Sequence, residues 1–173
     1  MKSFLVLAFV VCCAVWGDTA SLLTRHKHCS QPLDNSATWN NIIDVAQHAQ
    51  GLDKNHMTRI LPKMPEKEFK ENDSCCVHAN ILDYYLKNVL TDALPTNDHH
   101  SRLPIVKEEL HRVRRDLVTN ANCDLNKYDV YKYNKTFRKN FLATGVDATI
   151  KAISEMDILF HYLYESCGKE RCT

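Results

Sequence analysis

Glycine and proline are scarce in this chain. Its 173 residues include only four glycines and five prolines, whereas a dinucleotide-binding fold or a P-loop needs glycine where the backbone approaches phosphate. Runs of Val and Thr, which are typical of strands, are also few. The sequence therefore excludes a phosphate cradle, disfavours an all-β fold and favours a helical domain.

Neither sign of charge dominates the chain. Lys and Arg number 22 and Asp and Glu number 21, so the formal net charge is +1. Such a balance produces no long-range field that would indicate a nucleic-acid partner or an anionic membrane. The length and the apolar share of 45% suit one globular domain. We expect no nucleic-acid partner, no membrane insertion and no cofactor.

The N-terminus has the features of an export signal. A basic second residue precedes an apolar run at 4–16, which is shorter than the ~20 residues that span a bilayer. The small residue Gly17 follows, and the polar Asp18 ends the run, which disfavours a buried or anchoring N-terminal helix. The sequence predicts a signal peptide at 1–17 and a secreted, extracellular domain at 18–173.

Cysteine is abundant in the expected mature domain. Removal of the signal peptide leaves an even set: Cys29, Cys75, Cys76, Cys123, Cys167 and Cys172. An even set in an exported chain indicates disulfides rather than thiol chemistry. The neighbours Cys75 and Cys76 are poorly placed to bond each other, which leaves twelve of the fifteen possible pairings open. Glycosylation sequons at Asn72 and Asn134 fit the same compartment.

Apolar residues recur at helical spacing in five segments, and a sixth helical turn is possible within 52–65. The five predicted helices cover about 36–50, 75–90, 104–119, 130–144 and 147–166. The helix at 75–90 is apolar on most sides, which is typical of a central helix. The sequence predicts an all-α fold with a single bundle.

Chemistry-bearing motifs are incomplete. The string Cys75-Cys76-Val-His78 resembles the catalytic helix of secreted phospholipases A2, but the histidine is one residue early and no Asp or Gly-rich calcium loop accompanies it. Zinc sites commonly have two Cys-x-x-Cys pairs as ligands, and the sequence contains no such pair. We expect neither a catalytic residue nor a metal site. A secreted lipid hydrolase and a carrier with an apolar internal cavity remain the alternatives from other functional classes.

The last predicted helix resembles that of the interleukin-10 cytokine family. The segment 151–160, Lys-Ala-Ile-Ser-Glu-Met-Asp-Ile-Leu-Phe, carries the resemblance, and the string Thr-Arg-Ile-Leu at 58–61 is similar to that family's loop after the first helix. A terminal Cys167 favours the interleukin-22 branch of the family, whereas the segment 63–72 is similar to the interleukin-26 branch.

The resemblance implies a monomeric, disulfide-stapled bundle of six helices, of the four-helical cytokine type. It also implies the bridges Cys29–Cys123 and Cys76–Cys167. Cys75 and Cys172 are additional to the family pattern and are expected to form a third bridge. A swap between the two neighbours Cys75 and Cys76 stays open.

The resemblance further implies a non-catalytic function. A cytokine of this kind brings together two class II receptor chains, which triggers kinase-coupled transcription in epithelial or immune defence. The long receptor chain, of the interleukin-22 receptor type, would bind the last helix and the loop after the first helix. Carried over by position, its contacts would be Asp53, Arg59, Lys151 and Glu155.

The shared short chain of the interleukin-10 receptor would bind a neighbouring face that includes Trp39, Asn40 and Asn41. Lys151 and Glu155 are four residues apart, so both point the same way from a helix. They are either a charged pair at the centre of the docking patch or an ordinary surface salt bridge of about 0.3–0.5 kcal/mol.

Overall fold

A computed structural model describes residues 28–55, 57–63, 73–91 and 100–168. The predicted signal peptide at 1–17, the sequon at Asn72 and the sixth cysteine, Cys172, lie outside the described residues. Within the described part no strand is present, so the all-α prediction is confirmed. No described helix is both long and apolar enough to cross a bilayer.

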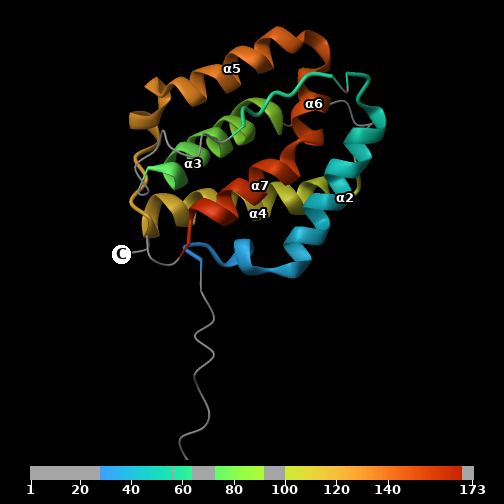
Figure 1. The fold of residues 1–173 in the computed structure, drawn as a ribbon. Coiled ribbons are helices and arrows are strands. Elements are labelled where there is room, and N and C mark those ends of the chain that lie inside the picture. The colour runs from blue at the N-terminus through green and yellow to red at the C-terminus, as the bar shows by residue number, and fades with distance from the viewer. Residues whose placement is uncertain (1–27, 56, 64–72, 92–99, 169–173) are drawn as a thin grey trace, which may run out of the picture.

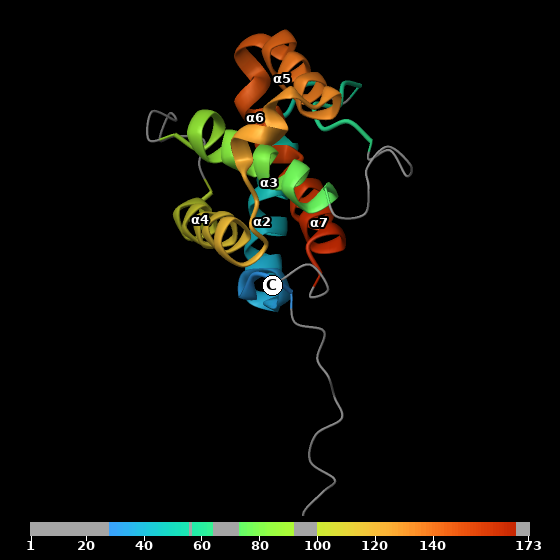
Figure 2. The same cartoon turned by 90° about the vertical axis from the view of Figure 1, so that its left-hand side faces the viewer.

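Six α-helices and several shorter helical turns make up the described chain. The α-helices are α2 (Ser36–Leu52), α3 (Ser74–Tyr84), α4 (Leu103–Asn120), α5 (Lys132–Thr144), α6 (Ala148–Ser154) and α7 (Met156–Ser166). The short turns are η1 (Gln31–Asp34), a π-helical continuation of α3 (Tyr85–Val89), η4 (Leu125–Val130) and η5 (Gly145–Asp147). Figures 1 and 2 both show α3 in the middle, with α5 on one side and α4 on the other.

The centre of the bundle is α3, as its apolar pattern predicts. Every residue from Ser74 to Asp83 is buried, and the fully buried rings of Tyr85, Phe137 and Phe160 fill the space around it. α4 also turns one apolar face inward, because Val106, Leu110, Val113 and Leu117 are all buried.

Two predicted helix ends shift. Gly51 does not stop the first helix but lies within α2, which ends at Leu52. The helix predicted from about residue 130 begins at Lys132, because the residues before it form the 3₁₀ turn η4. Gly145 does end α5: its φ of 71° is a left-handed conformation that glycine adopts without steric cost.

The last helix is interrupted, although its sequence predicts one continuous helix over 147–166. α6 ends at Ser154 and α7 begins at Met156, and the intervening Glu155 has the non-helical angles φ −106° and ψ 9°. The Glu155 amide donates to the carbonyl of Ala152, which tightens the turn. The apolar period of the sequence continues through this break, so it gives no sign of the interruption.

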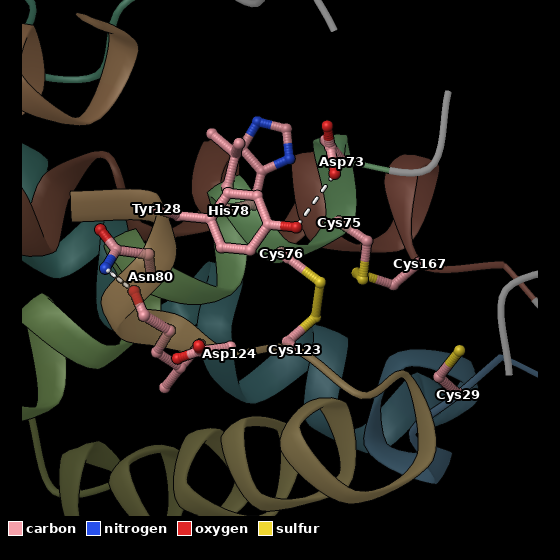
Figure 3. Close-up of a disulfide and its surroundings, with 12 residues drawn as sticks. Cys29, Asp73, Cys75, Cys76, His78, Asn80, Cys123, Asp124, Tyr128 and Cys167 are labelled. Carbon is pink, nitrogen blue, oxygen red and sulfur yellow. Dashed lines mark hydrogen bonds between the residues drawn. A yellow bond between two sulfur atoms is a disulfide. The ribbon is translucent and has the colours of Figure 1, made fainter. Parts of the chain in front are cut away.

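The disulfides differ from the pairing that the family resemblance implies. Cys75 bonds Cys167 with the Cα atoms 4.8 Å apart, and Cys76 bonds Cys123 at 5.1 Å. Figure 3 shows the two bridges leaving the first turn of α3 side by side. Successive residues of a helix point about 100° apart. Cys75 can therefore bond the end of α7 while Cys76 bonds the segment after α4.

The implied bridges Cys29–Cys123, Cys76–Cys167 and Cys75–Cys172 are thus wrong. Of the swap between the neighbouring cysteines, only the bond from Cys75 to Cys167 is present, because Cys76 bonds Cys123. Cys29 is itself disulfide-bonded. Its partner is none of the other four described cysteines, since those bond one another.

Candidate functional site

Three of the four residues predicted to contact the long receptor chain form a buried charged cluster. The Lys151 ammonium lies 2.9 Å from Oδ2 of Asp53 and 3.7 Å from Oε1 of Glu155. The exposed fractions are 6% for Asp53, 6% for Lys151 and 4% for Glu155. The expectation that they present a charged patch at the surface is therefore corrected. We call these three residues the buried charged cluster.

The buried charged cluster holds the loop that follows α2. The Glu155 carboxylate accepts hydrogen bonds from the backbone amides of Ile60, at 3.0 Å, and Leu61, at 2.8 Å. At the other end of the loop, Oδ1 of Asp53 accepts from the Asn55 amide at 2.9 Å. The side chains of Ile60 and Leu61 are fully buried and anchor the same stretch. The loop is thus fixed both by charge and by apolar contact.

Burial opposes the charge of Glu155. Loss of solvation raises the pKa of this carboxyl above its usual range, while the amides of Leu61 and Ile60 and the Lys151 ammonium lower it in part. The pKa of Asp157, two residues along, is raised as well, again chiefly by burial. Keeping the Glu155 carboxylate charged therefore costs free energy of desolvation, which its hydrogen bonds and the Lys151 ammonium only partly offset.

Arg59 is the one residue of the predicted long-chain contact set that is exposed. Its guanidinium donates to the hydroxyl of Tyr162 at 2.7 Å and lies 5.9 Å from the centre of that ring. Tyr162 is on α7 and was not among the predicted contacts. The sequence did contain a signal for Tyr162. It follows Glu155 by seven residues, and in the continuous helix that the sequence predicts, two residues with this spacing lie on the same face.

The residues predicted for the short receptor chain have three different environments on α2. Asn40 is exposed. Asn41 is partly buried and accepts a hydrogen bond from Arg102 at 3.2 Å. Trp39 is partly buried against the core: its Nε1 donates to the Leu33 carbonyl at 2.8 Å and its ring packs edge-on against Phe160.

The sequon at Asn134 is closed to a glycan in this fold. Asn134 is 0% exposed. Its Nδ2, the atom to which an N-linked glycan attaches, donates to Oδ1 of Asn80 at 2.7 Å and to the Tyr128 carbonyl at 3.0 Å. The predicted glycosylation at Asn134 is therefore incompatible with the structure, because a sugar would replace these bonds and could not fit inside the bundle.

The histidine of the phospholipase-like string is internal. His78 is 0% exposed and its Nδ1 lies 3.0 Å from Oγ of Ser166. Burial lowers the pKa of His78 to about 3. Figure 3 shows His78 on α3, the helix that also carries Cys75 and Cys76. A buried imidazole cannot serve a lipid substrate, which removes the observation that had suggested a hydrolase.

No protein-family model matches the chain. Among solved structures, the crystal structure of zebrafish interleukin-22 is similar, with a TM-score of 0.66 and 34% sequence identity. The match covers 80% of this chain and 96% of the zebrafish chain. The chain belongs to the interleukin-10 cytokine family. This confirms the resemblance found in the last helix, and the likeness to an interleukin-22 agrees with the branch that Cys167 favours.

In this cytokine the loop after α2 lies against the α6–α7 segment, although the two are more than ninety residues apart in sequence. The buried charged cluster joins them, and Arg59 and Tyr162 lie over the junction at the surface. The described part of the cytokine holds no group of three or more side chains suited to a metal ion.

Proposed function

We propose that this cytokine is secreted and acts as an interleukin-22-like ligand that brings together two class II receptor chains. The observation that carries the proposal is the likeness to zebrafish interleukin-22 along nearly the whole of that chain. The mechanism is non-catalytic. Once one receptor chain is bound, the second meets the complex at the high effective concentration of a shared membrane. The joined chains then trigger kinase-coupled transcription in epithelial or immune defence.

The long receptor chain docks on the surface formed by Arg59 and Tyr162. Arg and Tyr are among the residues that most often dominate binding energy at interfaces. Arg59 is held in place before binding by its hydrogen bond to Tyr162. The loop that carries Arg59 is held by the buried charged cluster. Asp53, Lys151 and Glu155 are accordingly positioning residues rather than contacts. Such pre-organisation reduces the entropy lost when the receptor binds.

The short receptor chain docks on a neighbouring face, to which α2 contributes Asn40. Trp39 supports this face from within by fixing η1 and α7 against α2. Both proposed surfaces belong to one chain, as a ligand that joins two receptor chains requires.

The substitution Arg59→Ala tests the long-chain surface. We expect about 30-fold weaker binding to a long-chain ectodomain of the interleukin-22 receptor type, which corresponds to a 2 kcal/mol interface residue. The melting temperature should hardly change, because Arg59 is exposed. Surface plasmon resonance measures the affinity, with Arg115→Ala on the exposed face of α4 as the matched control. Equal affinities of the two variants would remove this surface from the proposal, and a wild-type chain that binds no long-chain ectodomain would overturn the proposed function.

A further inference from the structure

The overall balance of charge conceals a strong asymmetry between two helices. α4 contains four basic and three acidic residues, and its exposed arginines are paired: Arg112 with Glu108 and Glu109, and Arg115 with Asp116. α5 contains four basic residues and no acidic one. The positive charge of α5 is therefore not compensated along its own helix.

Three lysines of α5 form one line on its outer face. Lys132, Lys135 and Lys139 are spaced three and four residues apart, which places them on the same side of a helix over about 10 Å of its length. All three are exposed. None of them forms an ion pair with any residue that the structure describes. We call these residues the α5 lysine stripe.

Arg138, the fourth basic residue of α5, differs from the three lysines because its charge is paired. Arg138 turns toward the bundle, where its guanidinium bonds Asp129 and Oδ1 of Asn80 and lies 5.6 Å from the centre of the Tyr84 ring. The one acidic residue of the adjoining turn η4 is this same Asp129, so its charge is already engaged. The lysines consequently face solvent without a neighbouring carboxylate on α5 or η4 to neutralise them.

The opposite face of α5 is committed to the core. Tyr133, Asn134 and Phe137 are buried against the rest of the bundle, so the stripe points away from it. Figure 2 shows α5 at the outer edge of the molecule, apart from α4 and α7. None of the residues assigned above to receptor contact belongs to α5. A ligand on the stripe would therefore leave the proposed receptor surfaces free.

We propose that the α5 lysine stripe binds a sulfated glycosaminoglycan. Such a chain is linear and carries a negative charge on each repeat, so it can lie along the stripe and contact successive ammonium groups. The attraction is electrostatic and needs no pocket. Its function would be to hold the cytokine at the cell surface and raise its local concentration. The inference rests on the charge and exposure of α5 and not on the proposed receptor contacts.

Two other polyanions fit the stripe less well. Specific nucleic-acid recognition favours arginine forks, and single strands are held on aromatic stacking platforms, whereas the stripe consists of lysines and the aromatic residues of α5 are buried or packed on the core. An anionic membrane would engage an amphipathic helix through its apolar face, but the apolar face of α5 is buried in the protein.

The test compares two triple variants of the chain. Lys132→Gln, Lys135→Gln and Lys139→Gln remove the stripe, while Lys107→Gln, Arg112→Gln and Arg115→Gln remove the same number of charges from α4. Gln and Lys have similar helix propensities, so both variants should fold. Circular dichroism and the melting temperature verify this. The probe is a heparin octasaccharide at about 0.1 M salt, where surface charges act over about 10 Å.

We expect the stripe variant to bind the octasaccharide about tenfold or more weakly than wild type, and the control variant to stay within about threefold, because only the uncompensated charges contribute. Fully desulfated heparin should not bind. The proposal is overturned by equal losses in the two variants, by no binding of wild type, or by stronger stripe-dependent binding to phosphatidylserine vesicles or single-stranded DNA. Long-chain receptor affinity, measured on the same variants, should not change, which separates a failure here from a failure of the proposed function.

Discussion

Two pairs of oppositely charged residues share the same spacing in this chain and have opposite environments. Glu108 and Arg112 on α4 are four residues apart, 2.9 Å apart in space, and 68% and 50% exposed at their side chains. Glu155 and Lys151 are also four residues apart and 3.7 Å apart in space, but their side chains alone are only 6% and 8% exposed. Spacing along a helix therefore determines whether two charged side chains can approach each other. It does not determine what their interaction contributes to the protein.

The difference lies in solvent and in further partners. Water screens the α4 pair, so the pair contributes little to stability and either member can be lost at small cost. The buried pair has lost its water and depends on Asp53 and on the amides of Ile60 and Leu61 to offset that loss. Because those partners lie on both sides of Arg59 in the loop after α2, the buried pair controls the position of a surface that it does not itself reach.

The largest expected effect is that of Lys151→Met, which keeps most of the side-chain volume and removes the charge. Two buried carboxylates then face each other without a cation, and breaking a buried ion pair in this way costs about 3–5 kcal/mol. Urea denaturation monitored by circular dichroism measures the free energy of unfolding. A loss below about 1 kcal/mol, the range of surface pairs, would mean that the cluster is hydrated in solution and that the contrast with α4 is false.

A smaller effect is expected from pH, with Glu155→Gln as the reference that does not titrate. The pKa of Glu155 is raised in the folded chain, so the folded state binds a proton more readily than the unfolded state between the usual pKa and the raised one. Stability therefore falls as pH rises through that window. We expect wild type to lose stability relative to Glu155→Gln as pH rises from the usual pKa of about 4.5 through the raised one.

The measurement is the free energy of unfolding of both chains across that pH range. The opposite slope, with wild type gaining on the variant as pH rises, would show that the amides of the loop and the Lys151 ammonium outweigh desolvation. In that case the pKa of Glu155 would be lowered, and the cluster would stabilise the fold outright rather than only position the loop.

The smallest effect is expected for Arg112→Ala on α4. This change removes an exposed i,i+4 pair, so the free energy of unfolding should fall by only about 0.3–0.5 kcal/mol. Added salt should reduce even that loss, because it screens exposed charges. A loss comparable to that of Lys151→Met, measured by the same denaturation, would show that exposure does not separate the two pairs.

Much of the site could be read from residue patterns. The string at 58–61 and the pattern at 151–160 identified both the loop and the helix that it meets, and Arg59 is exposed, as a receptor contact would have to be. The pattern could not tell which charged residues face outward, because a charged residue at a helix position is equally consistent with solvent and with a buried partner far away in sequence. The break at Glu155 was hidden for the same reason: its side chain is tied to backbone amides almost a hundred residues earlier.

Helical periodicity, the scarcity of glycine and the even number of cysteines were enough by themselves to establish a stapled helical bundle, because these depend on neighbours within a few turns. Folding in three dimensions alone decided which cysteines bond, that Asn134 is enclosed, and that Asp53, Lys151 and Glu155 are internal. Each of these depends on the rotation of one helix against segments distant in the chain. A change of one residue position turns a side chain by about 100°, which exchanges one partner for another.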